Sequence, residues 1–235
     1  MTLAEVMTKL EELGTEQTKK TFMRHGAKEP LFGVKVGDLK KLVKQVSKDQ
    51  GLALALYDTG NSDAMYLAGL SINPQMMTLP QLKHWVKQAN WYMLAEYTVA
   101  GAAAESPYAL KLAREWMRSD NEMIATCGWS TYANYVSITP DDQLDLEEIR
   151  TLLRLIESSI HEEQNRVRYT MNMFVIIAGS YVTGLYDEAI AVAESIGKVH
   201  VDVGQTACKV PLAADYIRKV AQRGKLGIKK KTCIC

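Results

Sequence analysis

The run QANWYMLAEYTVAGAAA, residues 88–104, sets the pattern for the whole chain. It is apolar and rich in aromatic residues, and one acid, Glu96, follows Tyr92 by four positions. On an α-helix the side chains at positions i and i+4 share a face, so this spacing predicts that the two side chains lie together. The residues of Val99–Ala104 are small enough to let a second helix approach closely. A buried acid is costly unless it is paired, solvated or used, so Glu96 either belongs to a site or simply faces water.

Amphipathic helices are predicted on both sides of this run. Apolar residues repeat at helical spacing along the chain, and Gly, Pro, Ser, Thr, Asn and Asp mark the starts and stops. We expect helices over residues 3–13, 15–25, 38–46, 51–57, 63–72, 81–88, 88–104, 107–117, 123–136, 144–159, 162–178, 185–196 and 206–222. Only GKVHVDVG, residues 197–204, alternates as a strand would, and it is too short and isolated to build a sheet.

Short helices joined by short loops predict an all-α protein of stacked antiparallel helix pairs. The pairs recur about every 35–45 residues, which is typical of a curved solenoid of the HEAT or armadillo kind. A compact helical bundle is the alternative. We predict a single repeat domain over residues 1–223 and a basic, mobile tail over residues 224–235, with Trp85, Trp116 and Trp129 in the core.

Composition excludes several classes of protein. With 47% hydrophobic and 23% charged residues, the 235-residue chain is typical of a globular protein rather than a disordered one. No apolar run approaches the ~18–20 residues that cross a bilayer, and the amphipathic N-terminus carries acids early, so we predict a cytoplasmic protein without membrane contact. Cys208, Cys233, Cys235 and His200 could ligate zinc, but a second closely spaced ligand pair is missing, so we predict no metal and no cofactor.

Charge is unevenly distributed in a chain whose net charge is only +1. From Gln205 onward, eight basic residues accompany a single acid, Asp215. Such an end suits a phosphate backbone or another acidic surface, and otherwise it is a solvated tail.

Several short segments carry a family resemblance. FMRHG at residues 22–26 and FGVKVGDL at residues 32–39 are similar to the N-terminal signature of the AlkD-like DNA alkylation repair proteins, which is a helix, a loop with an F-G-[IV]-x pattern and a basic amphipathic helix. Asn90–Glu96 resembles that family's aromatic-plus-acid motif, and Ser119-Asp120-Asn121 resembles the start of its repeats. The likeness extends to about Ile196. The resemblance implies HEAT-like repeats whose concave face binds duplex DNA; active members are glycosylases that excise N3- and N7-alkylated purines.

The resemblance also implies a catalytic group on the central run. Active members carry Trp-x-x-x-Asp there, and this chain has Tyr92 and Glu96, with Trp91 one position earlier. A carboxylate can stabilise the positive charge that develops on the sugar and orient the attacking water. Aromatic faces favour cationic bases by about 0.5–2 kcal/mol. Glu96, Tyr92 and Trp91 are therefore the predicted catalytic residues.

Two further positions depart from the family's pattern. An arginine and a second aromatic residue complete the familiar site, but an ungapped alignment puts Thr126 and Met173 there. A shift of one helical turn would instead bring in Trp129 or Arg168. Because glutamate is one methylene longer than aspartate, and because a misplacement of about 1 Å can cost ~100-fold in rate, activity is expected to suffer.

Binding should be less sensitive than catalysis, because phosphate contacts come from lysines, arginines and helix N-termini. The predicted nucleic-acid-binding residues are Lys35, Lys40, Lys41, Lys44, Arg166, Arg168 and Lys209, and Arg114 and Arg118 are further candidates. We predict a DNA-binding repeat protein of the alkylation repair type that contacts duplex or damaged DNA and has weak or lost glycosylase activity. An active glycosylase and a non-catalytic scaffold for a protein partner are the alternatives. The sequence does not set the oligomeric state.

Overall fold

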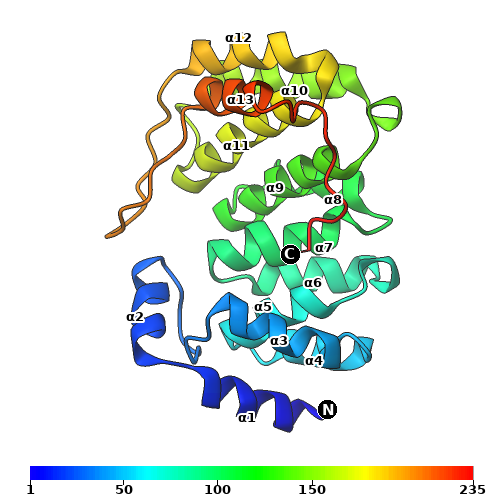
Figure 1. Ribbon diagram of the computed structural model, residues 1–235, viewed down its shortest axis with the longest axis vertical. Coiled ribbons are helices and arrows are strands. Elements are labelled where there is room, and N and C mark those ends of the chain that lie inside the picture. The colour runs from blue at the N-terminus through cyan, green and yellow to red at the C-terminus, as the bar shows by residue number, and fades with distance from the viewer. Residues whose placement is uncertain (235) are drawn as a thin grey trace. The chain divides into compact units, whose positions relative to one another are not determined.

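Thirteen α-helices follow one another along residues 1–234, the part of the chain that the computed structural model describes (Figure 1). Their bounds are α1 Leu3–Leu13, α2 Glu16–Arg24, α3 Val36–Val46, α4 Gln50–Asp58, α5 Ser62–Ser71, α6 Leu79–Gln88, α7 Ala100–Ala104, α8 Ala109–Trp116, α9 Glu122–Ile138, α10 Leu146–Ser159, α11 Asn165–Tyr181, α12 Tyr186–Ile196 and α13 Ala213–Gln222. Short 3₁₀ turns η1, η3 and η4 cover Pro74–Met76, Asp141–Gln143 and Thr183–Leu185, and η2, Leu94–Val99, is a π-helical turn. Over residues 1–234 no strand forms, so the all-α fold class is confirmed.

The helices begin where the sequence supplies a capping side chain. Thr2 accepts a hydrogen bond from the backbone of Glu5, whose carboxylate accepts one from Thr2 in return, and this capping box starts α1. Asn121, in the predicted repeat start, caps α9 by accepting from the amides of Met123 and Ile124 at 3.0 and 3.2 Å. Such caps satisfy amides that have no partner within the helix, which is why these boundaries were predictable from sequence.

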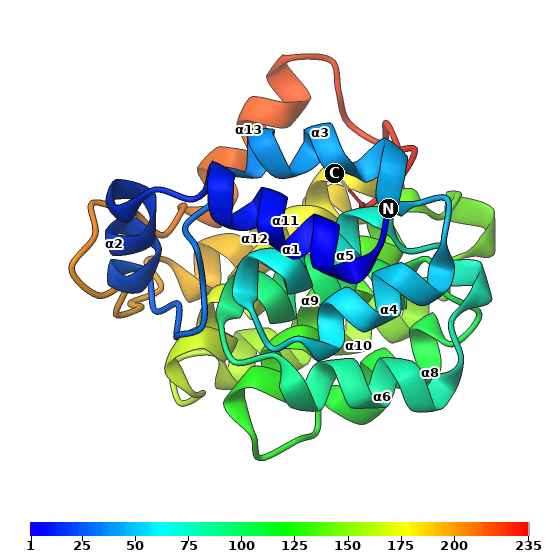
Figure 2. The ribbon, with the colours of Figure 1, turned by 90° about the horizontal axis from the view of Figure 1, so that it is seen from below.

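The chain divides into two compact units, so the single domain predicted over residues 1–223 is distributed between two cores. Unit 1 comprises Met1–Tyr108 with Gly204–Thr206 and Ile234. Its α1, α3 and α4 pack on α5 (Figure 2). Helix α5 also packs on η2, which α6 contacts as well. Gly69 of α5 permits the close approach, because a Cβ added there would collide with Thr98 of η2.

Unit 2 comprises Ala109–Val203 and Ala207–Cys233. Here α9, α11 and α13 form one layer, and α8, α10 and α12 pack behind them, so helix pairs stack in sequence order. Trp129 lies edge-on to Phe174 at a centroid distance of 5.5 Å in the core between α9 and α11. Trp85, Trp116 and Trp129 are all buried, as predicted.

The last helix differs from the prediction. It begins at Ala213 rather than Thr206, and no side chain caps it. Pro211 has no amide hydrogen, and a proline also disfavours helical geometry in the residue before it, so residues 206–212 remain outside the helix. The helix start predicted at residue 206 is therefore wrong.

The basic C-terminal segment lies against unit 2 instead of extending freely. The amides of Gly227 and Lys230 donate to the carbonyls of Ser180 and Ser137 at 2.9 and 2.8 Å. The Lys229 ammonium donates to the Val136 carbonyl at 3.0 Å. These bonds satisfy carbonyls at the C-terminal ends of α9 and α11, and this gives a physical reason why the segment differs from the mobile tail that charge alone predicts.

Within residues 1–234, no single helix is long and apolar enough to cross a membrane. Taken together, Asn165–Tyr181 and Thr183–Ile196 have the length and composition of a membrane span, but these two segments are bent by 120° relative to each other.

Candidate functional site

Glu96 lies on the π-helical turn η2 and is only 6% exposed. Sequence spacing predicted a continuous α-helix through residues 88–104, but α6 ends at Gln88. Helical structure begins again near Trp91, whose carbonyl accepts from the amides of Leu94 and Ala95 at 2.9 and 3.1 Å. A π turn holds more residues than an α turn, and such turns are frequent at functional sites. The prediction that Tyr92 and Glu96 share a face assumed α-helical spacing, so it does not hold for a π-helical turn. The reading in which Glu96 simply faces water is wrong.

Trp91 is anchored to α2 rather than presented to a ligand. It is 4% exposed, and its indole Nε1 donates to the His25 carbonyl at 2.8 Å. Its ring lies 5.3 Å from that of Phe22. Because the indole is hydrogen-bonded to His25 and lies beside Phe22, Trp91 fixes η2 against α2.

Tyr92 is partly exposed and stands at the edge of this aromatic group. Its ring lies 5.8 Å from Trp91 in an edge-on arrangement, and its hydroxyl is 3.5 Å from Nδ1 of His25. His25 was not among the predicted site residues, although it stands in the FMRHG segment that carries the family resemblance. The structure thus joins the two resembling segments, 22–26 and 90–96, in one cluster of unit 1.

The loop at residues 32–34, the F-G-V part of the family signature, is held by a buried acid that sequence reasoning missed. Asp63, 3% exposed, accepts from three consecutive amides, those of Phe32, Gly33 and Val34, at 2.6, 3.0 and 2.9 Å. Burial raises the pKa of Asp63, and the three amide hydrogen bonds oppose that effect. Gly33 has φ +80°, and a Cβ there would collide with the backbone of Lys19. The F-G-V pattern therefore positions the start of α3.

Helix α3 presents a row of exposed lysines. Lys35, at the N-cap, makes no capping hydrogen bond, and Lys40 and Lys44 lie one turn apart on the outer face. Lys41 is ion-paired with Asp38 at 2.6 Å, whereas Lys35, Lys40 and Lys44 form no ion pair with any residue in 1–234. A positive charge at a helix N-terminus opposes the helix dipole, so Lys35 does not serve the stability of α3.

The predicted arginines of unit 2 are half-buried at the start of α11. The Arg166 guanidinium lies 4.0 Å from the centroid of the Tyr169 ring. Arg168 reaches Asn165 Oδ1 at 3.5 Å, and its Nε is buried without a hydrogen-bond acceptor in the described part of the chain. Lys209 is exposed in the stretch before α13. Both arginines thus lie on the α9–α11–α13 layer.

Thr126 and Met173 are the positions where an ungapped alignment predicts the family's arginine and second aromatic residue. Thr126 is fully buried in α9, and within residues 1–234 its hydroxyl has no partner. Met173 is partly buried in α11. The alternative register offers Trp129, which is a core residue at 2% exposure, or Arg168, whose Nε is buried without an acceptor in the described part of the chain.

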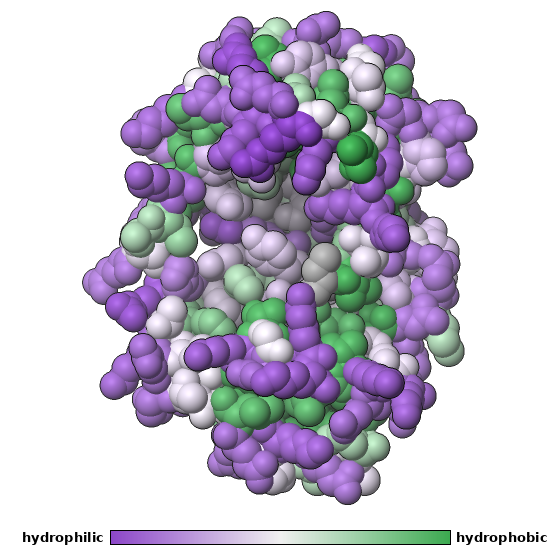
Figure 3. Space-filling model, in the orientation of Figure 1, coloured by the Kyte–Doolittle hydropathy of each residue, from purple (hydrophilic) through white to green (hydrophobic). Residues whose placement is uncertain are grey.

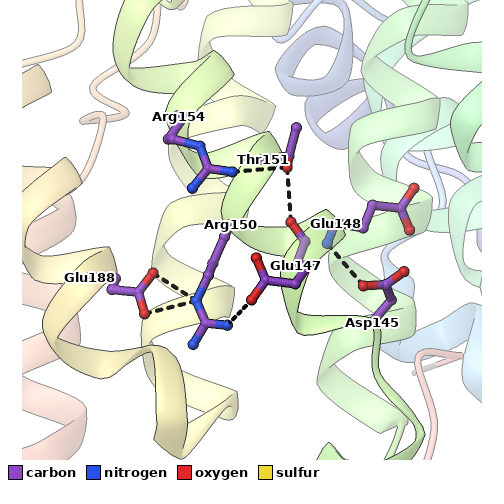
Figure 4. A network of polar contacts seen from close by, with 7 residues as sticks. All are labelled: Asp145, Glu147, Glu148, Arg150, Thr151, Arg154 and Glu188. Carbon is purple, nitrogen blue, oxygen red and sulfur yellow. Dashed lines mark hydrogen bonds and ion pairs between the residues drawn. The ribbon is translucent and has the colours of Figure 1, made fainter.

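A polar network ties α10 to its neighbours in unit 2 (Figure 4). The Arg150 guanidinium donates to Glu188 at 2.9 Å and to Glu147 at 2.6 Å. Arg114 binds Glu148 through two hydrogen bonds of 2.6 Å, which raise the pKa of the guanidinium and lower that of the carboxyl. Arg114, a further candidate for phosphate binding, is therefore neutralised within the fold.

Among residues 1–234, no three His, Cys, Asp or Glu side chains converge as metal ligands would. Cys235, one of the possible zinc ligands, lies outside the described residues.

Comparison with known proteins agrees with this arrangement. A family described as DNA alkylation repair enzyme matches residues 6–209. An uncharacterized protein of Listeria monocytogenes serovar 1/2a is 36% identical over 231 residues, covering 96% of this chain and 100% of its own. One of Listeria innocua serovar 6a is 34% identical over 229 residues, covering 95% and 99%.

A solved structure matches the whole of this chain over the whole of its own, with 34% identity and a TM-score of 0.92. It is described as a new family of proteins related to the HEAT-like repeat DNA glycosylases, with affinity for branched DNA structures. This likeness confirms the HEAT-like repeat architecture predicted from the sequence.

Proposed function

We propose, because this chain belongs to the DNA alkylation repair enzyme family, that it binds duplex and branched DNA and has weak or lost glycosylase activity. The observation that carries the binding proposal is the row of exposed lysines on α3. Lys40 and Lys44 share one exposed face and have no ion-pair partner in residues 1–234, so they suit successive phosphates, and Lys35 adds a charge at the start of the helix. The solved relative's affinity for branched DNA supports this choice of ligand.

The reduced activity follows from what surrounds the acid. Glu96 keeps the carboxylate that could stabilise a developing positive charge on the sugar. Two observations support reduced activity: Trp91 is held in the core, and the ungapped alignment puts Thr126 where the family has an arginine. Glu96 alone supplies electrostatic stabilisation without the groups that would position a base against it.

The binding proposal is tested by fluorescence anisotropy on a duplex and a three-way junction over a salt series. Each phosphate contact contributes about −0.9 to the slope of log affinity against log salt. The double variant K40Q/K44Q should therefore bind more weakly and with a slope reduced in size by about 2. The control K9Q/K87Q removes two exposed lysines from α1 and α6 of the same unit and should leave the slope nearly unchanged.

No affinity for either DNA at low salt would contradict the proposal. The alternative, a repeat scaffold that binds a protein partner, would then be favoured. Equal losses in the two double variants would also show that binding follows net charge rather than the α3 lysines.

Catalysis is tested separately on alkylated DNA. We expect slow or undetectable release of 3-methyladenine and 7-methylguanine, and any release should disappear in Glu96→Gln while DNA binding is unchanged. Rapid release by the unaltered chain would refute the proposal of weak or lost activity. Release that survives Glu96→Gln would refute the assignment of Glu96.

A further inference from the structure

Tyr216 is an aromatic side chain on the outer face of α13, and it is 49% exposed. Its neighbour in the chain, Ile217, is fully buried, so α13 is firmly seated in unit 2. Helical spacing places Lys219 and Arg223 on the same face as Tyr216, three and seven residues further on. Asp215, the acid of α13, points about 100° away from Tyr216 around the helix; it lies about 40° from Lys219, one turn earlier, and is not ion-paired with it.

A second tyrosine lies next to this face. Tyr181 ends α11, which packs against α13, and it is partly exposed. Because α11 packs on α13, Tyr181 and Tyr216 belong to adjacent helices of unit 2. Burial raises the pKa of Tyr181, and the phenol of Tyr216 raises it further. The ammonium of Lys230 lies 5.4 Å from the centroid of the Tyr181 ring.

The C-terminal segment fixes the lysine beside that ring. The backbone of Lys230 donates to Ser137 at 2.8 Å, and Lys229 turns the other way to pair with Asp141 at 2.8 Å. Lys229 thus holds the segment to the fold, whereas Lys230 is exposed. Because the backbone is anchored, Lys230 keeps its position without a partner acid.

The basic residues around the tyrosines are unneutralised. Arg218, on another face of α13, is paired with Glu194. Five exposed residues form no ion pair with any residue in 1–234: Lys219, Arg223, Lys225, Lys230 and Lys231. Hydrophilic side chains gather over α13 in Figure 3, with hydrophobic ones among them.

We propose that Tyr216, Tyr181 and these five basic residues form a platform for the unpaired nucleotides of single-stranded DNA. Aromatic faces on which bases stack, set in a positively charged surface that tracks the phosphates, are what single-stranded nucleic acid requires. A duplex keeps its base faces stacked inside and would use only the charges. This inference rests on the proposed DNA binding. It adds that unit 2 contacts the unpaired strand near a branch.

The test measures binding of a fluorescent oligo-dT and of a duplex to the full chain and its variants. Stacking of one base is worth about 1–3 kcal/mol, so Tyr216→Ala should lose about 5- to 150-fold for oligo-dT and less than about 2-fold for the duplex. Tyr216→Phe keeps the ring and should bind oligo-dT as the unaltered chain does. Tyr97→Ala, a change at a tyrosine of 50% exposure in unit 1, is the matched control and should have no effect.

Two further arms separate the sources of binding. The variant K219Q/R223Q should weaken oligo-dT binding and reduce the salt slope by about 1.4, the loss of two contacts of ~0.7 each. Polyglutamate should not displace oligo-dT at equal charge. Displacement by polyglutamate, together with full binding by Tyr216→Ala, would show a merely charged surface and overturn the proposal.

The outcomes also distinguish the two proposals. Duplex binding that depends on the α3 lysines, with no affinity for oligo-dT, would overturn the platform and leave the proposed function standing. Loss of both affinities in the unaltered chain would overturn both.

Discussion

Replacing Asp63 by asparagine should destabilise the protein by about 2–4 kcal/mol. The Asp63 carboxylate accepts three backbone hydrogen bonds, two at Oδ2 from Phe32 and Gly33 and one at Oδ1 from Val34. An asparagine can keep its oxygen at the Oδ2 position, where it still accepts from Phe32 and Gly33, but it turns an NH₂ donor toward the amide of Val34. The Val34 amide and the new NH₂ group are then two buried donors without an acceptor. A buried donor left without a partner costs about 1–3 kcal/mol, so two would cost about 2–6 kcal/mol, and relaxation of the loop keeps the total in the lower half of that range.

The measurement is urea unfolding followed by circular dichroism, with Asp58→Asn as the matched control. Asp58 makes an exposed pair with His84 at 2.9 Å, so the same chemical change there should cost at most about 1 kcal/mol. If Asp63→Asn costs no more than Asp58→Asn, the three amide bonds do not hold the signature loop and the reasoning is wrong. A loss of DNA affinity should accompany the loss of stability, because the loop positions Lys35 and the start of α3.

Three other outcomes are expected. Gly37 is exposed on the lysine face of α3 with open space around it, so Gly37→Ala should raise stability by about 0.4–1 kcal/mol in urea unfolding; it should lower DNA affinity if phosphates approach the backbone there. The hydrogen bond from Arg114 lowers the pKa of Glu148 in the folded protein. The stability that this carboxylate contributes is therefore present above its pKa in the unfolded chain and is lost as the pH falls through its pKa in the folded protein. Glu148→Gln should be less stable than the unaltered chain at pH 7, and the difference in thermal melts should close below about pH 4. Trp91→Phe removes the bond to the His25 carbonyl and should cost about 1–3 kcal/mol by the same unfolding assay; an unchanged midpoint would contradict its role as an anchor.

Local signals predicted most of the helices and part of the site. The cap at Asn121 and the apolar periodicity of α3 depend on residues within one or two turns, and their patterns survive folding unchanged. The lysines of α3 were predicted to be exposed for the same reason, since they alternate with a buried face. Trp129 was predicted to be buried because a large apolar ring gains most from leaving water.

Other features depend on contacts between residues far apart in the sequence. The acid that holds the signature loop, Asp63, is about thirty residues from the amides it binds, and no local pattern marks it. The anchoring of Trp91 on α2 and the docking of Lys229 on the ends of α9 are of the same kind. The sequence by itself determined most of the helices, several of their caps and the family to which the chain belongs. Tertiary structure alone decided which polar groups were taken up internally and which stayed available, because a buried amide or carbonyl must find a partner wherever the fold brings one.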